Sequence, residues 1–268
     1  MPELPEVETT CRALAQCCIG HTISGLECLS PRLRYPLDAT LQAAVGQKVC
    51  DVKRRAKYIY FVLERGYIVC HLGMSGFFRW DQRALKKHDH VLIHFPHTRL
   101  IYNDPRRFGF MLWSVSSPCQ ALWSHLGPEP LSDDFNLSYI LSHKLTQSRL
   151  PIKVLLMDAR WVVGIGNIYA SEVLFLAGIS PETLAKSLQA IHWQALLLHI
   201  KKILAQAIDA GGCSIKNFAY GDKLGYFSQS LQVYGRGSQP CMHCHTLLVS
   251  KKIGQRSSVY CPQCQPCL

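Results

Sequence analysis

Residues 58–74 read YIYFVLERGYIVCHLGM and contain two short runs, rich in β-branched and aromatic residues, on either side of an Arg-Gly pair. Such residues are enriched in strands, and a glycine between two runs is typical of a tight turn. The stretch therefore predicts two strands, 58–64 and 67–74. HVLIHF at 90–95 and RFGFMLW at 107–113 are further runs of the same kind. Short, closely spaced strands favour an antiparallel sandwich or barrel between about residues 20 and 125.

Both flanks of this β region have helical patterns. Residues 2–18 place prolines and glutamates in a first helical turn, and Val7, Leu14 and Cys18 recur at helical spacing. GPEPLSDDF at 127–135 has the composition of a hinge, and after it the helical period continues to Gly211.

These patterns predict an α+β protein of three pieces. Residues 1–126 form an N-terminal helix with an antiparallel β-sandwich, residues 127–229 form a helical domain, and residues 230–268 form a short, basic, cysteine-rich appendage.

The charge of the chain points to a polyanionic partner. Its 268 residues carry a formal net charge of +11, which fits nucleic acid or an anionic membrane. The acidic start is unlike a signal peptide, and no uninterrupted apolar run approaches the length of a membrane span. We therefore expect a soluble, cytoplasmic protein that binds nucleic acid and not a membrane.

The 13 cysteines fall into two groups. Eight are scattered among apolar residues without regular spacing, which is typical of buried free thiols in a reducing cytoplasm. They are Cys11, Cys17, Cys18, Cys28, Cys50, Cys70, Cys119 and Cys213.

The C-terminal cysteines have the spacing of a zinc site. Cys241 and Cys244 form one Cys-x2-Cys pair, and Cys261 and Cys264 form another. Four thiolates predict one tetrahedral Zn²⁺ with a structural role, because no position is left for a catalytic water. SKKIGQRSSVY at 250–260 lies between the pairs and predicts a basic hairpin suited to contacting phosphates.

Pro2 becomes a terminal secondary amine if Met1 is removed, with Glu3 and Glu6 close by. An α-amino group has a pKa of about 8 and a lysine one of about 10.4, so the free amine is roughly 200-fold more abundant at pH 7. Such an amine can condense with an aldehyde-level carbon to give an iminium. On these residues alone, PELPEVE as a plain helix start is the simpler interpretation.

Three further segments have both a structural and a functional interpretation. GIGN at 164–167 is either a packing turn or a helix N-terminus that binds phosphate. HLGMSG at 71–76 and NDPRRFG at 103–109 are either sandwich turns or loops that push side chains into a base stack.

The chain closely resembles the bacterial formamidopyrimidine-DNA glycosylases of the Fpg/Nei family, which act in base-excision repair. The resemblance runs nearly from end to end and includes the four-cysteine finger. The matching blocks are PELPEVET (2–9), RRAKY (54–58), HLGMSG (71–76), KHDHV (87–91), DPRRFG (104–109), HLGPEPLSDDF (125–135), VVGIGNIYASE (162–172) and LQVYGR (231–236).

The resemblance implies a β-sandwich, a helix–two-turns–helix domain and a zinc finger, with damaged duplex DNA held between them. It implies a bifunctional glycosylase and AP lyase that excises oxidised purines. Pro2 would attack C1′, and the iminium would undergo β- and δ-elimination. Glu3 would be the general acid–base, and Glu6 would support the extruded base or the catalytic network.

The resemblance also implies the DNA contacts. Lys57 and Arg256 would complete the catalytic set by holding phosphates around the lesion, together with His71, Asn167 and Tyr234; His88 and Lys153 are further phosphate contacts. Met74, Arg106 and Phe108 would fill the vacated stack, with Arg106 pairing to the orphaned cytosine.

Residues 211–227 match the family's lesion-capping loop in position but depart from it at Cys213, Ser214 and Asn217. The ranking of 8-oxoguanine against ring-opened purines therefore stays open. Two alternatives remain: a Nei-type enzyme for oxidised pyrimidines, and a non-catalytic damage-binding protein. The sequence offers no clear oligomer interface, so we expect a monomer.

Overall fold

The computed structural model describes residues 2–80, 84–116, 120–212 and 231–268. By its internal contacts the chain divides into two compact units. The first comprises Met1–Ser124 with Gly211–Tyr226, and the second comprises His125–Ala210 with Phe227–Leu268. Within the described residues, no helix combines the length and the apolar character that crossing a membrane requires.

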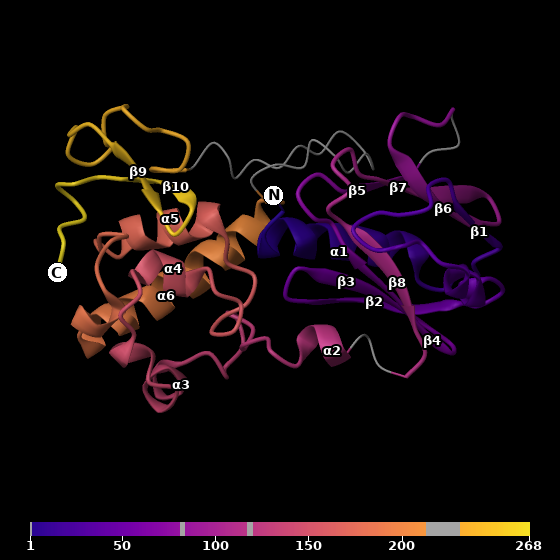
Figure 1. Ribbon diagram of the computed structural model, residues 1–268, viewed down its shortest axis with the longest axis horizontal. Coiled ribbons are helices and arrows are strands. Elements are labelled where there is room, and N and C mark those ends of the chain that lie inside the picture. The colour runs from indigo at the N-terminus through magenta and orange to yellow at the C-terminus, as the bar shows by residue number, and fades with distance from the viewer. Residues whose placement is uncertain (1, 81–83, 117–119, 213–230) are drawn as a thin grey trace. The chain divides into compact units, whose positions relative to one another are not determined.

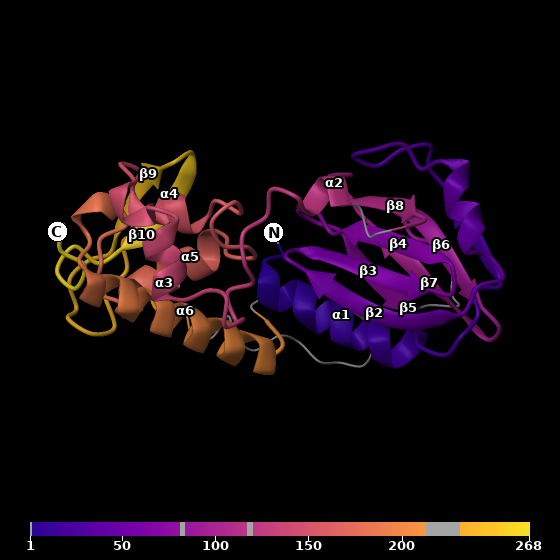
Figure 2. The same ribbon diagram turned by 90° about the horizontal axis from the view of Figure 1, so that it is seen from below.

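The first unit is an antiparallel β-sandwich with a helix beside it. Helix α1 (Leu4–Cys18) lies along β2 and β3 (Figures 1 and 2). One sheet has the order β1 (Gly25–Cys28), β6 (Asp89–Phe95), β7 (Thr98–Asn103) and β5 (Phe77–Trp80). The other has the order β2 (Val49–Arg55), β3 (Tyr58–Leu63), β4 (Gly66–His71) and β8 (Phe110–Ser114). Short helical turns occur at η1 (Ala39–Ala44) and α2 (Gln120–Trp123).

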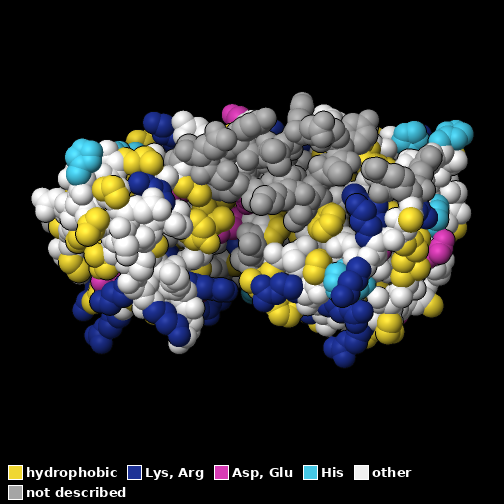
Figure 3. All heavy atoms as spheres, turned by 90° about the horizontal axis from the view of Figure 1, so that it is seen from above, with side chains coloured by type: hydrophobic (Ala, Val, Ile, Leu, Met, Phe, Trp, Pro, Cys, Tyr) yellow, Lys and Arg dark blue, Asp and Glu magenta, His cyan; other side chains and the backbone are white. Residues whose placement is uncertain are grey.

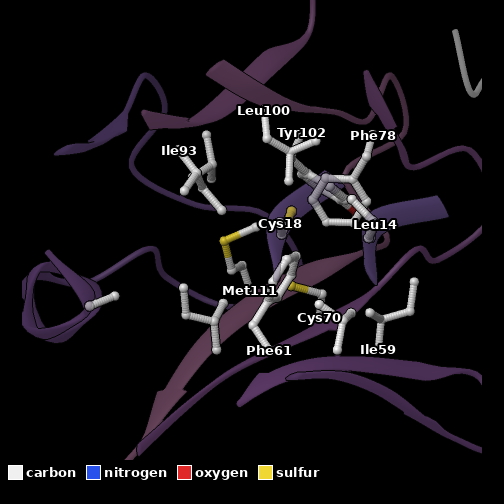
Figure 4. Close-up of a cluster of buried hydrophobic side chains, with 14 of the residues drawn as sticks. Leu14, Cys18, Ile59, Phe61, Cys70, Phe78, Ile93, Leu100, Tyr102 and Met111 are labelled. Atoms are coloured by element: carbon white, nitrogen blue, oxygen red, sulfur yellow. The ribbon is translucent and has the colours of Figure 1, made fainter. Parts of the chain in front are cut away.

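The core of this unit is filled from both sheets and from α1. Figure 4 shows Leu14 of α1, Phe61 of β3 and Phe78 of β5 meeting there, and each is almost fully buried. Aromatic edge contacts join Phe78 to Phe61 and to Tyr102 of β7. This packing fixes the ends of the strands from which the loops of the candidate site start.

The strands predicted at 58–64, 67–74 and 90–95 are confirmed with small shifts of their ends. The stretch 67–74 ends as a strand at His71, because Gly73 turns with φ +63°. The strand predicted at 107–113 begins only at Phe110, since Arg107 has φ +54° and belongs to a hydrogen-bonded loop.

The second unit combines helices with a two-stranded hairpin. Its α-helices are α3 (Leu137–Ser142), α4 (Ile152–Leu156), α5 (Asn167–Leu176) and α6 (Ala190–Asp209), and its 3-10 turns are η2 (Leu145–Gln147) and η3 (Ala185–Ser187). Strands β9 (Val249–Ile253) and β10 (Arg256–Tyr260) pair antiparallel, with Gly254 and Gln255 between them. The α+β fold expected from the sequence, with its helical domain and four-cysteine finger, is confirmed.

The scattered cysteines that the structure describes are free thiols of differing exposure. Cys11, Cys18 and Cys70 are buried, Cys17 and Cys28 are half-buried, and Cys50 is exposed. Burial, the largest cause, raises the pKa of Cys11 to about 12, so this thiol stays protonated and unreactive. Cys119 and Cys213 lie outside the described residues.

Candidate functional site

Pro2 stands directly before a helix whose first turn is closed by two carboxylates. Glu3 is the N-cap of α1, and its side chain accepts the backbone N–H of Glu6. In return, Oε2 of Glu6 accepts the N–H of Glu3 at 2.8 Å. Such a reciprocal capping box satisfies helix donors that would otherwise lack partners. Glu3 is only 2% and Glu6 only 6% exposed. The two predicted acids are therefore held in place beside Pro2.

Gly212 lies against this capping box within the same unit. A methyl group at Gly212 would stand 2.9 Å from Oε1 of Glu6, and the φ of Gly212 is +82°. Only glycine fits that backbone and that spacing without strain. The sequence patterns did not indicate this contact. The residues after Gly212, up to 230, lie outside those the structure describes, and with them most of the predicted capping loop.

Lys57 sits in the two-residue turn between β2 and β3, where Arg55 pairs with Tyr58. Arg54 supports this turn by donating from Nη1 to the carbonyl of Ala56 at 3.0 Å. Nε of Arg54 donates to Oε2 of Glu8 on α1 at 2.7 Å. This chain of contacts connects the helix that carries Glu3 to the turn that carries Lys57.

His71 ends β4 and is held as a neutral imidazole. Burial, followed by the charges of Lys57 and Arg34, lowers the pKa of His71 to about 4, although Asp104 opposes the shift. Nδ1 of His71 accepts the N–H of Gly73 at 2.9 Å, and the ring stacks on Phe110. The neutral ring therefore carries its proton on Nε2, where it can donate to an oxygen acceptor.

We expect the imidazole of His71 to titrate near pH 4 in an NMR titration, and Arg34→Ala to move its pKa upward. The folded state favours the neutral ring, whereas the unfolded chain binds a proton on this ring below about pH 6.5. The contribution of His71 to the free energy of unfolding is therefore fully present above pH 6.5 and is lost as the pH falls toward about 4. A midpoint near 6.5 in the folded protein would contradict the described environment.

Met74, Arg106 and Phe108 stand on two loops that touch through their backbones. A side chain at Gly73 would collide with the carbonyl carbon of Phe108 and the N–H of Gly109. Phe108 is 47% exposed, and the guanidinium of Arg106 lies over its ring, 4.8 Å from the centroid. The structure thus brings the three residues of the predicted wedge onto one paired loop structure, which we call the double loop (71–76 with 104–109).

His88 precedes β6 in a segment fixed by a buried ion pair. Asp89 bonds Arg79, and its Oδ1 accepts Nδ2 of Asn103 at 2.7 Å. The carbonyl of His88 accepts the N–H of Asp104 at 3.0 Å. His88 is therefore attached to the base of the double loop.

In the second unit, Lys153, Asn167 and the finger hairpin come together. Lys153 is only 1% exposed, and its Nζ donates to Oγ of Ser258 at 2.7 Å. Nδ2 of Asn167, at the start of α5, donates to the carbonyl of Ser257 at 2.9 Å. Arg256 begins β10 next to these serines and is exposed. Lys153 and Asn167, both predicted phosphate contacts, thus hold strand β10, which carries Arg256, a third predicted contact.

Tyr234 belongs to a loop held by a buried carboxylate of α5. Oε1 of Glu172 accepts the N–H groups of Val233 at 3.0 Å and Tyr234 at 2.8 Å, and Oε2 accepts that of Gln232 at 2.8 Å. Three N–H donors stabilise an ionised carboxylate, and here they set the backbone of Tyr234. Glu172 is 1% exposed.

The four predicted zinc ligands converge. The sulfurs of Cys241, Cys244, Cys261 and Cys264 all lie within 4.8 Å of one another. Sγ of Cys241 is 3.9 Å from that of Cys264, and Sγ of Cys244 is 3.4 Å from that of Cys261. Zn–S bonds of about 2.3 Å in a tetrahedron would separate the sulfurs by about 3.8 Å, so the donor set fits Zn²⁺.

Besides Gly212, three residues with roles in the site were not singled out from the sequence: Arg34, Asp104 and Glu172. Arg34 influences His71 from a distant loop, and no local pattern signals this. Asp104 and Glu172 lie inside the quoted blocks DPRRFG and VVGIGNIYASE. Only their burial and backbone partners reveal what they do.

The helical unit and its four-thiolate finger define a helix–two-turns–helix protein with a zinc finger. The family model of the formamidopyrimidine-DNA glycosylase N-terminal domain matches residues 1–111, and that of the H2TH domain of the same enzyme matches residues 126–219. The model of the zinc finger found in FPG and IleRS matches residues 238–266.

Individual relatives match over the full length. Two relatives are each 46% identical to this chain over 99% of its length: the formamidopyrimidine-DNA glycosylases of Acinetobacter baumannii (strain SDF) and Escherichia coli (strain 55989). The match covers 97% of the Acinetobacter protein and 100% of the Escherichia coli protein.

Solved structures agree. A complex of Lactococcus lactis Fpg with DNA containing an abasic site has a TM-score of 0.91 at 33% identity, over 98% of this chain and 99% of that one. The structure of MutM in complex with DNA containing carbocyclic 8-oxo-G also has a TM-score of 0.91 at 33% identity. The match covers 99% of this chain and 100% of that one. The chain belongs to the formamidopyrimidine-DNA glycosylase family.

Proposed function

We propose that Pro2 is the nucleophile with which this bifunctional DNA glycosylase and AP lyase removes oxidised purines, 8-oxoguanine and formamidopyrimidines, from duplex DNA. The observation that carries the proposal is the capping box, which holds two buried carboxylates beside the N-terminal proline. A pure damage-binding protein needs neither a terminal amine nor positioned acids. The proposal requires that Met1, which lies outside the described residues, be removed.

The reaction begins with the lesion nucleotide extruded from the stack, which exposes its C1′. The nitrogen of Pro2 bonds to C1′ as the base leaves with the electrons of the glycosidic bond. The proton that the Pro2 nitrogen then gives up neutralises the departing base. Glu3, in its protonated form, gives a proton to the sugar-ring oxygen, so the ring opens and an iminium remains. Loss of the C2′ proton then expels the 3′ phosphate, and a second elimination expels the 5′ phosphate. Glu6 fixes Glu3 through the capping box and supports the extruded base.

The remaining predicted residues act on the DNA around this centre. Lys57, His71, Asn167, Tyr234 and Arg256 hold phosphates, and His88 is a further candidate. Lys153 is buried and bonded to Ser258, so it supports the strand of Arg256 and does not contact a phosphate itself. Met74, Arg106 and Phe108 fill the vacated stack, and Arg106 faces the orphaned base. Lys and Arg side chains stand out on the surface of each unit in Figure 3, as expected for a phosphate-binding protein.

The four cysteines hold a structural zinc that stiffens the hairpin of Arg256 and takes no part in the chemistry. We further propose that the enzyme works as a monomer in the bacterial cytoplasm, where its DNA substrate lies. Its domain borders are proposed near residues 126 and 229.

Borohydride trapping on a duplex with one 8-oxoguanine opposite cytosine tests the proposal. Reduction should fix the iminium, and mass spectrometry should map the adduct to Pro2. Tight binding without an adduct would favour the damage-binding alternative, unless the intact mass shows that Met1 is retained. An adduct on a lysine would reassign the nucleophile.

Arg256→Ala is expected to weaken DNA binding and to reduce the slope of log K against log salt by about 0.9, the effect of one lost phosphate contact. Lys186→Ala, at an exposed position of η3 outside the basic hairpin, is the matched control for a general loss of charge. The measurement is the DNA affinity of both variants between 50 and 200 mM salt, and only Arg256→Ala should have a shallower slope than the wild-type protein. An unchanged slope for Arg256→Ala would remove Arg256 from the interface.

A further inference from the structure

The carboxylate of Asp104 lies at the centre of the double loop. Asp104 follows β7 and is fully buried. Its Oδ1 accepts Oγ of Ser75 at 2.6 Å and the N–H of Arg106 at 3.2 Å, and its Oδ2 accepts the N–H of Gly109 at 2.8 Å. One charged group thus satisfies three donors, and hydrogen bonds to an ionised acceptor are the stronger kind.

These donors come from both halves of the double loop. Ser75 directly follows Met74, whereas Arg106 and Gly109 bracket Phe108. The N–H of Arg106 also lies 3.1 Å from Oγ of Ser75, which closes the triangle. Asp104 therefore holds the two backbones from which all three wedge side chains project.

The main chain of Asp104 is fixed in turn by a buried histidine. Nε2 of His90 lies 2.9 Å from the carbonyl oxygen of Asp104, and Nδ1 lies 2.7 Å from Oγ of Ser30. Since a carbonyl can only accept, Nε2 carries the proton and Nδ1 accepts from the Ser30 hydroxyl. Burial, the largest cause, lowers the pKa of His90 and keeps this tautomer neutral.

A buried acid in a loop that faces DNA is unfavourable for phosphate binding, because its charge repels the polyanion. Its position is explained if the carboxylate orders the loop instead of contacting the substrate. An ordered loop needs no further loss of backbone freedom when it enters the base stack, whereas a loose loop does.

We propose that Asp104 is a positioning residue that sets the wedge of Met74, Arg106 and Phe108 before DNA binds, and that it thereby controls discrimination of the base opposite the lesion. This inference rests on the proposed wedge function. Asp104 touches neither the reacting atoms nor Pro2 in this scheme and acts through the three wedge residues. Its charge also raises the pKa of His71, but burial and the charges of Lys57 and Arg34 outweigh it and keep that ring neutral.

Asp104→Asn tests the inference with almost no change in shape. Whichever way the amide turns, its NH₂ group faces an N–H donor, either that of Gly109 or that of Arg106. We expect the ratio of single-turnover excision rates opposite cytosine and opposite adenine to change by at least about fivefold, because the Arg106 guanidinium loses its fixed position. Borohydride trapping on a single-stranded abasic oligonucleotide, which has no opposite base, should stay within about twofold of wild type.

Three variants make the outcome decisive. Asp51→Asn is the matched control, since Asp51 is in the same unit but pairs with Lys53 on β2. Ser75→Ala removes one donor and leaves the carboxylate its two N–H partners; if Asp104→Asn does not fold, this variant carries the test, with a change of at least about twofold. Arg106→Ala tests the wedge itself.

An unchanged base ratio in the folded Asp104→Asn protein, with a changed ratio in Arg106→Ala, would overturn the positioning role alone. An unchanged ratio in Arg106→Ala would overturn the wedge assignment and the inference with it. Equal losses on duplex and single-stranded substrates would show that Asp104 serves only general stability, which also contradicts the proposal.

Discussion

Pro2→Gly is expected to lower covalent trapping and strand cleavage by at least about a hundredfold. The iminium formed by a secondary amine is positively charged at every pH, whereas the imine of a primary amine must first be protonated. Glycine also frees the rotation about the N–Cα bond that the proline ring prevents, so the amine is no longer held in the direction of C1′. The measurement is single-turnover cleavage of an 8-oxoguanine duplex, with borohydride trapping in parallel.

Pro5→Ala is the matched control, because it changes the proline in the first turn of α1, close to Pro2 in the sequence, and leaves the terminal amine intact. It should keep trapping near the wild-type level. Duplex binding by Pro2→Gly should also persist, since the phosphate contacts are untouched. If Pro2→Gly cleaved at the wild-type rate, the nucleophile would have to be sought elsewhere.

Removal of the zinc is expected to reduce specific DNA binding to the nonspecific level, on the order of a thousandfold weaker. The finger core is small: Val233, Leu248 and Val259 pack with the buried cysteines against Phe175 of α5. A core of this size does not hold a fold without its metal. The hairpin of Arg256 would lose its position, together with its contacts to Lys153 and Asn167.

The β-sandwich should survive zinc removal, because its core contains none of the four ligands. The measurement is a titration with a chelator, in which DNA binding and the melting transition of the β-sandwich are both followed. DNA binding should be lost while the melting transition persists. Cys244→Ser should reproduce the loss, whereas Cys267→Ser, an exposed cysteine outside the cluster, should not. Wild-type affinity in a zinc-free protein would refute the role assigned to the finger.

The parts of the fold that sequence periodicity predicted are those governed by local rules. The strands 58–64 and 90–95 alternate or concentrate apolar residues, and each appears within one residue of its expected bounds. The strand expected from 107 starts at Phe110, because Asp104 draws the backbone of 106–109 into a loop. These hydrogen bonds join a carboxylate to the backbone of a turn, and the periodicity of hydrophobic residues contains no information about them.

The candidate site shows the same division. The two Cys-x2-Cys pairs predicted the convergence of the four thiols, because the spacing of these ligands is a local feature of the sequence. The neutral state of His71 depends first on its burial and then on the charges of Lys57 and Arg34, which approach it from separate turns. The contact of Gly212 with Glu6 joins residues more than two hundred positions apart. Only the folded chain brings such partners together, so spacing along the sequence cannot predict them.

The backbone contact of Gly73 with Gly109 limits how this enzyme can be redesigned. Because Gly73 approaches the backbone of Phe108 and Gly109 too closely for a side chain, a library that varies one loop must preserve the glycines through which it meets the other. Arg106 and Phe108 point outward from that contact and are exposed, so they are the positions open to exchange. If the wedge acts as proposed, we expect a new preference for the base opposite the lesion to come from substitutions at these two positions, with Gly73 and Gly109 unchanged.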